Sequence, residues 1–153
     1  MMYLSLYYYF LIALLIPILP YLIYQAKSIR RAVPELSEAV GITGATSMLV
    51  ESRKKLLFIG ESTIAGVGVQ HQKEGIAGKV CEHLHQETGE QYQWQVLAKS
   101  GYRTRDIIKY ILKNLPSQCP DLIVIGMGGN DTFQLTSPVR FSQEMHTIIQ
   151  RLQ

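Results

Sequence analysis

The stretch Asp121–Met127 reads DLIVIGM, and after Asp121 it is a strongly apolar run of the kind found in strands that are buried on both faces of a sheet. Two earlier stretches are also largely apolar: Lys55–Ile59 reads KLLFI, and Trp94–Ala98 reads WQVLA. Each run is followed within a few residues by glycine, which is typical of a strand that ends in a turn. We therefore expect three β-strands at these positions.

Apolar residues recur at helical spacing after each expected strand. The spacing predicts one helix over residues 74–88, ended by Gly89, and a second helix with Thr104 as its N-cap and Pro116 beyond its end. A third helix is expected from Pro138 onward. This alternation predicts an α/β fold with a flavodoxin-like, doubly wound parallel sheet, in which the C-terminal strands are missing and the first strand lies between the other two.

The N-terminal segment Met2–Tyr24 contains no charged residue. As a helix, its 23 residues would reach about 34 Å, enough to cross a bilayer. Tyrosines lie near both of its ends, as in the aromatic belts of membrane spans: Tyr3, Tyr7, Tyr8, Tyr9, Tyr21 and Tyr24. A cleaved signal peptide is disfavoured because no basic residue precedes the apolar run. A buried core helix would rarely be this long without one polar face. We therefore expect a single transmembrane anchor over residues 2–24.

Basic residues follow this segment and none precedes it, beginning with Lys27, Arg30 and Arg31. The positive-inside rule therefore predicts that the chain after the anchor lies in the cytoplasm. After the anchor we expect a juxtamembrane connector over residues 25–53 and one α/β domain over residues 54–153.

Composition disfavours several other classes of protein. The formal charge is only +3, and no basic run is interleaved with aromatic residues, so nucleic acid is not an expected partner. Cys81 and Cys119 are too few for a disulfide framework, and the four histidines are not spaced as metal ligands. Gly66 and Gly68 are followed by His71 where a dinucleotide-binding motif needs a third glycine. We therefore expect no metal and no cofactor.

Polar or small residues follow each expected strand: Ser62, Gly101 and Asn130. Ligand sites of open parallel sheets form at the carboxyl ends of the strands, so these residues are expected at one edge. A serine hydroxyl can act as a nucleophile when a base accepts its proton. The backbone N–H groups of Ser62 and Gly101, with the Asn130 amide, could stabilise the oxyanion of a tetrahedral intermediate. The pattern favours acyl transfer.

At these residues the sequence resembles the SGNH, or GDSL-type, hydrolase family. The first block of that family corresponds to Gly60-Glu61-Ser62, although the family has aspartate where this chain has Glu61. The glycine of the second block corresponds to Gly101, and the third block to Gly128-Gly129-Asn130-Asp131. The resemblance implies an esterase with Ser62 as nucleophile, an oxyanion hole from Ser62, Gly101 and Asn130, no cofactor, and a small-molecule, lipid or carbohydrate ester as substrate.

The general base of that family is a histidine in a late Asp-x-x-His block, which does not occur in residues 1–153. We do not expect any histidine of this chain to replace it: His71, His83, His85 and His146. Of these, His71 is the first candidate, because it lies in the loop after the nucleophile. The expectation is that the chain stops before the block. The alternative to an active esterase is therefore a catalytically incomplete, truncated or fragmentary chain.

Overall fold

The computed structural model describes residues 2–47 and 54–153. The chain forms two compact units, residues 1–35 and residues 36–153. Residues 48–53 of the expected connector lie outside the described residues.

The N-terminal unit is helical throughout its described length up to Ala32. Helix α1 (Met2–Leu15) passes through a 3₁₀ turn, η1 (Ile16–Ile18), into helix α2 (Leu19–Ala32). The helix therefore continues beyond residue 24, into the region expected to be a connector, because the Gln, Ala, Lys and Arg residues that follow are good helix formers. Within it, Tyr9–Ile29 is long and apolar enough to cross a membrane.

The second unit contains a four-stranded sheet in the order β1-β3-β2-β4. Its strands are β1 (Thr43–Ala45), β2 (Lys54–Gly60), β3 (Tyr92–Ala98) and β4 (Leu122–Gly126). Strand β2 pairs in parallel with both β3 and β4, which confirms the expected arrangement of the three apolar runs. Strand β1 was not predicted, and it pairs antiparallel with β3, so the sheet is mixed rather than wholly parallel.

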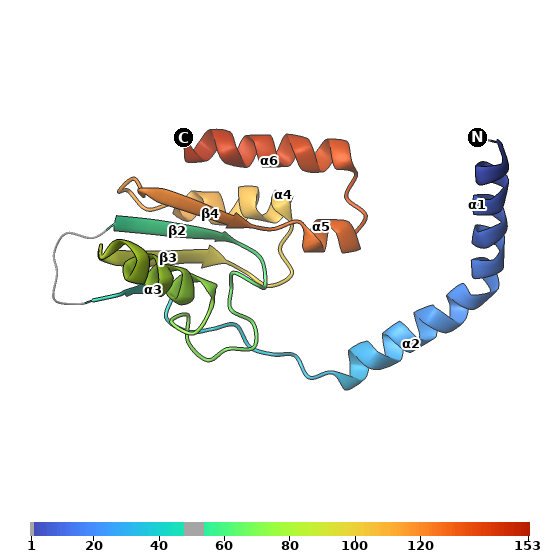
Figure 1. Ribbon diagram of the computed structural model, residues 1–153, viewed down its shortest axis with the longest axis horizontal. Coiled ribbons are helices and arrows are strands. Elements are labelled where there is room, and N and C mark those ends of the chain that lie inside the picture. The colour runs from blue at the N-terminus through green and yellow to red at the C-terminus, as the bar shows by residue number, and fades with distance from the viewer. Residues whose placement is uncertain (1, 48–53) are drawn as a thin grey trace. The chain divides into compact units, whose positions relative to one another are not determined.

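Helices cover both faces of this sheet (Figure 1). Helix α3 (Ile76–Thr88) packs on one face, and α6 (Pro138–Leu152) lies on the other. The second predicted helix starts as α4 (Thr104–Asp106), continues as a π-helical turn, η2 (Ile107–Ile111), and ends as a 3₁₀ turn, η3 (Leu112–Asn114). A short helix that was not predicted, α5 (Gly129–Phe133), follows β4. The expected α/β fold class is confirmed.

Strand β2 supplies residues to both halves of the core. Leu56 and Phe58 pack toward α3, whereas Leu57 and Ile59 pack toward η2, η3 and α6. All four side chains are buried, because neighbouring residues of a strand point to opposite faces and both faces are covered by helices. This explains why the sequence of the strand is continuously apolar.

Strands β2 and β4 approach closely where they end. A Cβ atom at Gly60 would lie 2.2 Å from the carbonyl oxygen of Gly126 and 2.6 Å from the Ile64 side chain. Any larger residue at position 60 would therefore separate the strands or displace the loop that carries Ile64. The absence of a side chain at Gly60 lets the loop after β2 turn directly over the end of β4.

Candidate active site

The loops that follow β2, β3 and β4 begin at one edge of the sheet. Gly60, at the end of β2, is in register with Ala98 of β3 and with Gly126 of β4. Because these strands are parallel, their carboxyl ends lie at the same level. The predicted site residues lie two to four positions beyond these ends: Ser62, Gly101 and Asn130.

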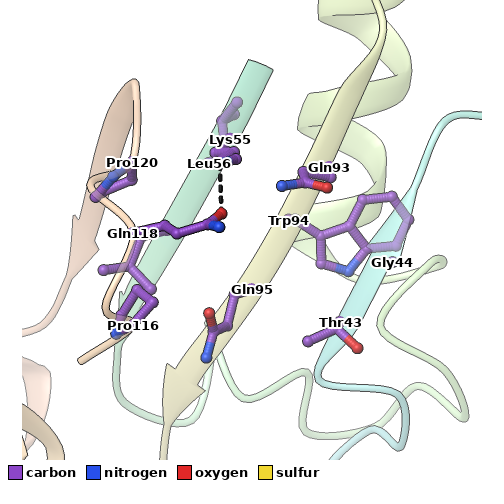
Figure 2. A pocket seen from close by; sticks show the side chains of 11 residues that line it. Thr43, Gly44, Lys55, Leu56, Gln93, Trp94, Gln95, Pro116, Gln118 and Pro120 are labelled. Atoms are coloured by element: carbon purple, nitrogen blue, oxygen red, sulfur yellow. Dashed lines mark hydrogen bonds between the residues drawn. The ribbon is translucent and has the colours of Figure 1, made fainter. Parts of the chain in front are cut away.

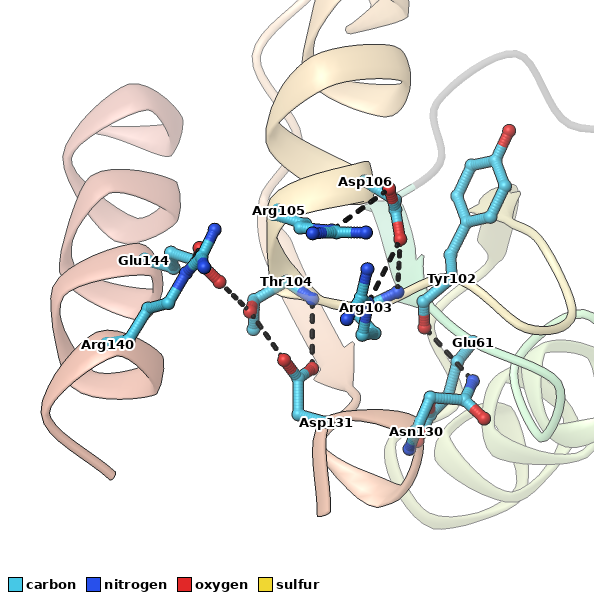
Figure 3. Close-up of polar contacts among 10 residues, drawn as sticks. All are labelled: Glu61, Tyr102, Arg103, Thr104, Arg105, Asp106, Asn130, Asp131, Arg140 and Glu144. Carbon is cyan, nitrogen blue, oxygen red and sulfur yellow. Dashed lines mark hydrogen bonds and ion pairs between the residues drawn. The ribbon is translucent and has the colours of Figure 1, made fainter. Parts of the chain in front are cut away.

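Glu61 joins the loop after β2 to the loop after β4. Its side chain is buried, and the carboxylate accepts hydrogen bonds from the backbone N–H groups of Gly129, at 2.8 Å, and Asn130, at 3.0 Å (Figure 3). A carboxylate that accepts two N–H groups at the start of a helix is favourably placed, since those groups have no partner within the helix. Glu61 directly precedes Ser62, so these hydrogen bonds hold the backbone of Asn130 next to the loop that carries Ser62.

Asn130 joins the loop after β4 to the loop after β3. Its side-chain Nδ2 atom donates a hydrogen bond to the backbone carbonyl of Tyr102 at 3.0 Å (Figure 3). A carboxamide nitrogen carries two hydrogens, so this contact orients the amide and uses only one of them. Among the described residues no partner is seen for the second. Because Tyr102 directly follows Gly101, all three loops are connected through Glu61 and Asn130.

Two backbone donors at this edge are also free within the described part of the chain. The N–H groups of Ser62 and Gly101 make no hydrogen bond to any described residue. Gly101 is exposed and has a φ of +81°, a conformation that glycine adopts without strain. Free N–H groups of this kind are what the oxyanion of an acyl-transfer intermediate requires.

Asp131 fastens the loop after β4 to the start of α4. Its buried carboxylate accepts the backbone N–H of Thr104 at 2.9 Å, and it contacts the Thr104 hydroxyl at 3.0 Å. The same hydroxyl contacts the carboxylate of Glu144 in α6, which pairs with Arg140 at 2.8 Å (Figure 3). Asp131 thus holds its own loop by binding a residue of another loop.

The start of α4 differs from the prediction. Thr104 was expected as the N-cap, but Arg103 occupies that position and Thr104 is the first helical residue. The backbone N–H of Arg103 donates to the Asp106 carboxylate at 3.1 Å, and the Arg103 side chain approaches the same carboxylate at 3.7 Å. The hydroxyl of Thr104 faces Asp131 and is therefore not used for capping its own helix.

Ser62 borders an open hollow of about 530 Å³. Its lining residues come from the loop after β2, from the residues just before α3 and from the start of α3, and they include Ser62, Val67, Val69, Glu74, Ile76 and Lys79. Ser62 itself is half-buried. The hollow is therefore lined by apolar residues together with one acidic and one basic side chain, Glu74 and Lys79.

A second hollow, of about 200 Å³, lies near the opposite ends of the strands (Figure 2). It is bordered by residues at the start of β2 and β3 and by the segment before β4, including Lys55, Gln93, Trp94 and Pro120. Lys55 donates a hydrogen bond to the Gln118 side chain at its margin, at 2.5 Å. Because this hollow is at the other end of the strands, it shares no residue with the edge that carries Ser62.

No histidine is hydrogen-bonded to Ser62 within the described residues. His71 is exposed, and its backbone forms an isolated parallel β-bridge with Val40. The His85 side chain contacts the carbonyl of Glu90 through Nδ1 at 2.7 Å. His83 and His146 are exposed on α3 and α6. The described residues also contain no cluster of three side chains suited to a metal ion.

Sequence reasoning missed the residues that hold the loops together. It treated Glu61 only as a conservative replacement of aspartate, and it assigned no role to Glu144. The available signal was the position of Glu61: an acidic residue directly after a wholly buried strand must find hydrogen-bond donors, or its burial is costly. The N–H groups at the start of α5 supply those donors.

In a comparison with known proteins, residues 58–153 match the GDSL-like lipase/acylhydrolase family. Two similar solved structures are AlinE4, an SGNH-hydrolase family esterase, and TesA. AlinE4 is 26% identical with a TM-score of 0.58, and the match covers 67% of this chain and 55% of AlinE4. TesA is 25% identical with a TM-score of 0.54, and the match covers 65% of this chain and 54% of TesA. This chain thus spans about half the length of both. No curated protein sequence gives a match.

Proposed function

The chain belongs to the GDSL-like lipase/acylhydrolase family, and on this premise we propose that it is an SGNH-type ester hydrolase with Ser62 as its nucleophile. The observation that carries the proposal is the linkage of three loops at one sheet edge. Glu61 binds the backbone of Asn130, and the Asn130 amide binds the carbonyl that follows Gly101. Among the described residues, one N–H of the Asn130 side chain and the backbone N–H groups of Ser62 and Gly101 have no partner, and acyl transfer needs such donors.

The reaction follows from these groups. The Ser62 hydroxyl oxygen attacks the ester carbonyl carbon while a base accepts its proton. The carbonyl oxygen becomes an oxyanion, which accepts hydrogen bonds from the N–H groups of Ser62 and Gly101 and from the Asn130 amide. The C–O bond of the ester then breaks, and the alcohol leaves with the proton. Water hydrolyses the acyl group on Ser62 and regenerates the hydroxyl.

A second candidate is favoured by the positions of the histidines. None is hydrogen-bonded to Ser62 within the described residues, so the residues that are present offer a nucleophile and oxyanion donors without an assigned base. Residues 1–153 by themselves would then be catalytically incomplete and would hydrolyse esters very slowly. This alternative keeps the same fold and the same loop contacts, and it differs only in the proton acceptor.

An added base separates the two candidates. We expect residues 1–153 to be acylated on Ser62 by p-nitrophenyl acetate when imidazole is supplied as an external base, because the hydroxyl then has a proton acceptor. Intact-protein and peptide mass spectrometry would locate the acyl group. The Ser62→Ala variant is the control for the reaction of imidazole with the ester and for acylation of other side chains.

The outcomes of this experiment are distinct. Acylation of Ser62 only with imidazole supports an SGNH site that lacks its base in residues 1–153. Acylation without imidazole identifies an internal base, and His71→Ala is the first variant to examine. Equal acylation of the wild-type chain and of Ser62→Ala in both conditions would show that Ser62 is not the nucleophile.

We also propose that the N-terminal helix anchors the enzyme in a membrane as a single span, with the domain on the cytoplasmic side. The proposal is supported by Tyr9–Ile29, which is long and apolar enough to cross a bilayer, and by the basic residues Lys27 and Arg31 near its C-terminal end. The substrate class that fits the family is an ester of a small molecule, a lipid or a carbohydrate. No nucleic acid is expected as a partner.

Carbonate extraction tests this anchor. The full chain is expected to remain in the membrane pellet at alkaline pH, because a spanning helix is not held by charge alone. Leu19→Arg places a charge at the centre of the apolar segment and should increase the fraction that is released, since arginine at the centre of a span costs about 2.5–3.5 kcal/mol. Complete release of the unaltered chain would contradict the proposal. A reporter fused after Gln153 would establish the orientation.

A further inference from the structure

A segment before β1 crosses the loop that carries Ser62. Residues 36–42, which we call the strap, lie outside the family match of residues 58–153. Backbone hydrogen bonds join the strap to the loop after β2: the N–H of Ala39 donates to the carbonyl of Ala65 at 3.0 Å, and the N–H of Gly68 donates to the carbonyl of Ser37 at 3.2 Å. The strap is therefore held against the loop after β2 by backbone hydrogen bonds.

Glu38 extends the strap to the loop after β3. One oxygen of its carboxylate accepts the backbone N–H of Ser100 at 2.7 Å, and the other accepts the Lys99 ammonium group at 2.9 Å. The other backbone contacts of this loop are longer: the N–H groups of Lys99 and Tyr102 both bond at 3.3 Å, and the Tyr102 carbonyl accepts the Asn130 amide at 3.0 Å. The hydrogen bond to Ser100 is charge-assisted and is therefore the stronger restraint.

The loop after β3 has few other restraints. Lys99, Ser100 and Gly101 are exposed, and a Cβ atom at Gly101 would meet no atom within 4 Å. Gly101 has no side chain with which to fix its own position. Its N–H direction is consequently set by its neighbours, and Glu38 binds the residue immediately before it.

Charge holds this contact at neutral pH. Partial burial by itself would raise the pKa of Glu38, but the hydrogen bonds from Lys99 and from the Ser100 backbone, with the positive charge of Lys99, lower that pKa below its ordinary value of 4.5. Since the folded-state pKa is depressed, the stabilisation is fully present above 4.5 and is lost as the pH falls through the folded-state value. Lys99 is the one charged side chain that contacts Glu38 in the described part of the chain.

We propose that Glu38 is a positioning residue that fixes the Ser100–Gly101 loop so that the Gly101 N–H faces the oxyanion at Ser62. The proposal rests on the proposed function of Ser62 and Gly101. It adds that the strap, which is not part of the matched family region, contributes to the oxyanion site. The strap holds the loop after β2 through its backbone and the loop after β3 through Glu38, and so sets these two loops relative to each other.

Hydrogen exchange of the Ser100 amide tests the contact without any need for activity. In the full chain in detergent, Glu38→Ala is expected to accelerate Ser100 exchange about tenfold, because the lost charge-assisted hydrogen bond is worth about 1.4 kcal/mol or more. Glu38→Gln retains an acceptor oxygen and should have a smaller effect. Glu87→Ala removes an exposed carboxylate of α3 and is the matched control, with unchanged exchange at Ser100.

Two further readouts distinguish positioning from a general loss of structure. The NMR amide shift of Ser100 should titrate with a midpoint below 4.5, and this titration should vanish in Glu38→Gln. The rate constant for imidazole-supported acylation of Ser62 should fall about tenfold in Glu38→Ala with KM unchanged, less than the loss expected when a donor itself is removed. Thermal unfolding monitored in parallel shows whether the domain remains folded.

Each outcome decides the proposal. Unchanged Ser100 exchange in Glu38→Ala, or a Ser100 titration at 4.5 or above, overturns the contact. Faster exchange with unchanged acylation shows that Glu38 holds the loop without positioning the oxyanion donor, which also overturns the proposal. If the wild-type chain is never acylated on Ser62, the proposed function fails, whereas the exchange and titration results still decide whether Glu38 fixes the loop.

Discussion

Replacing Asn130 by alanine is expected to lower the rate constant for acylation of Ser62 by about 10²–10³ while KM changes little. The Asn130 amide is held by the carbonyl of Tyr102 at 3.0 Å, and its second N–H has no partner among the described residues. An N–H that is already oriented interacts more strongly with the developing oxyanion than with the neutral carbonyl of the bound ester. Its loss should therefore raise the barrier without weakening substrate binding.

Acylation rates of the wild-type chain and of Asn130→Ala, measured over a range of ester concentrations, provide the comparison. Asn114→Ala is a matched control, because Asn114 also donates from Nδ2 to a backbone carbonyl, that of Tyr110, at 3.0 Å on the exposed side of η3. This variant should acylate at the wild-type rate. A rise in KM alone for Asn130→Ala would show that Asn130 binds the substrate or supports the loop, and that the oxyanion role is wrong.

Replacing Glu61 by alanine is expected to destabilise the second unit by about 3–5 kcal/mol. The buried carboxylate of Glu61 accepts the N–H groups of Gly129 and Asn130, and both donors lose their partner in the variant. A hydrogen bond to a charged group contributes about 1.5–3 kcal/mol, so two of them account for an effect of this size. Glu61→Gln keeps one acceptor oxygen and should be destabilised by less.

Urea unfolding of the full chain in detergent would measure this effect through the fluorescence of Trp94. Trp94 is the single tryptophan of the chain and is buried against α3, so its emission reports the loss of this core. Glu82→Ala provides the control, since the pair that Glu82 forms with Lys79 on α3 is exposed, and the midpoint of this variant should be unchanged. Equal midpoints for Glu61→Ala and the wild-type chain would show that the contacts to α5 do not stabilise the fold.

The central part of the fold could be predicted from the sequence because its signals are strong. The largely apolar stretches of β2, β3 and β4 favour strands covered on both faces. The helices α3 and α6 begin and end close to the predicted residues, helped by Gly89 and Pro138. In these places the local preference and the tertiary packing agree.

Strand β1 could not be predicted, because it has only three residues, Thr43 to Ala45, and two of them are glycine and alanine, which are depleted in strands. It is a strand because of its partner: Gly44 lies beside the Trp94 ring, where a Cβ atom would come within 2.1 Å of a ring carbon. Helix α5 was also missed, since glycine and asparagine indicate a turn. It forms because Glu61, 68 residues before Gly129, satisfies its first N–H groups.

In the candidate site, too, some features could be predicted from the sequence and others could not. Ser62, Gly101 and Asn130 were predicted because each follows a strong strand signal and matches a family block. Their catalytic roles remain predictions. The contacts that hold their loops, through Glu38, Glu61 and Asp131, join residues 27 to 69 positions apart. Such pairs leave no periodic trace in the sequence, so only the structure shows them.

The central place of β2 in the sheet also determines how the domain must fold. Leu56 pairs with Trp94 and with Leu122, partners that follow it by 38 and 66 positions. The entropy of closing a flexible loop grows only slowly with length, so the longer closure costs about 0.5 kcal/mol more than the shorter one. During synthesis from the N-terminus, β2 leaves the ribosome before β3 and β4 do. Its apolar residues therefore stay without strand partners until β3 has emerged, and during this interval the nascent chain is open to association with other chains.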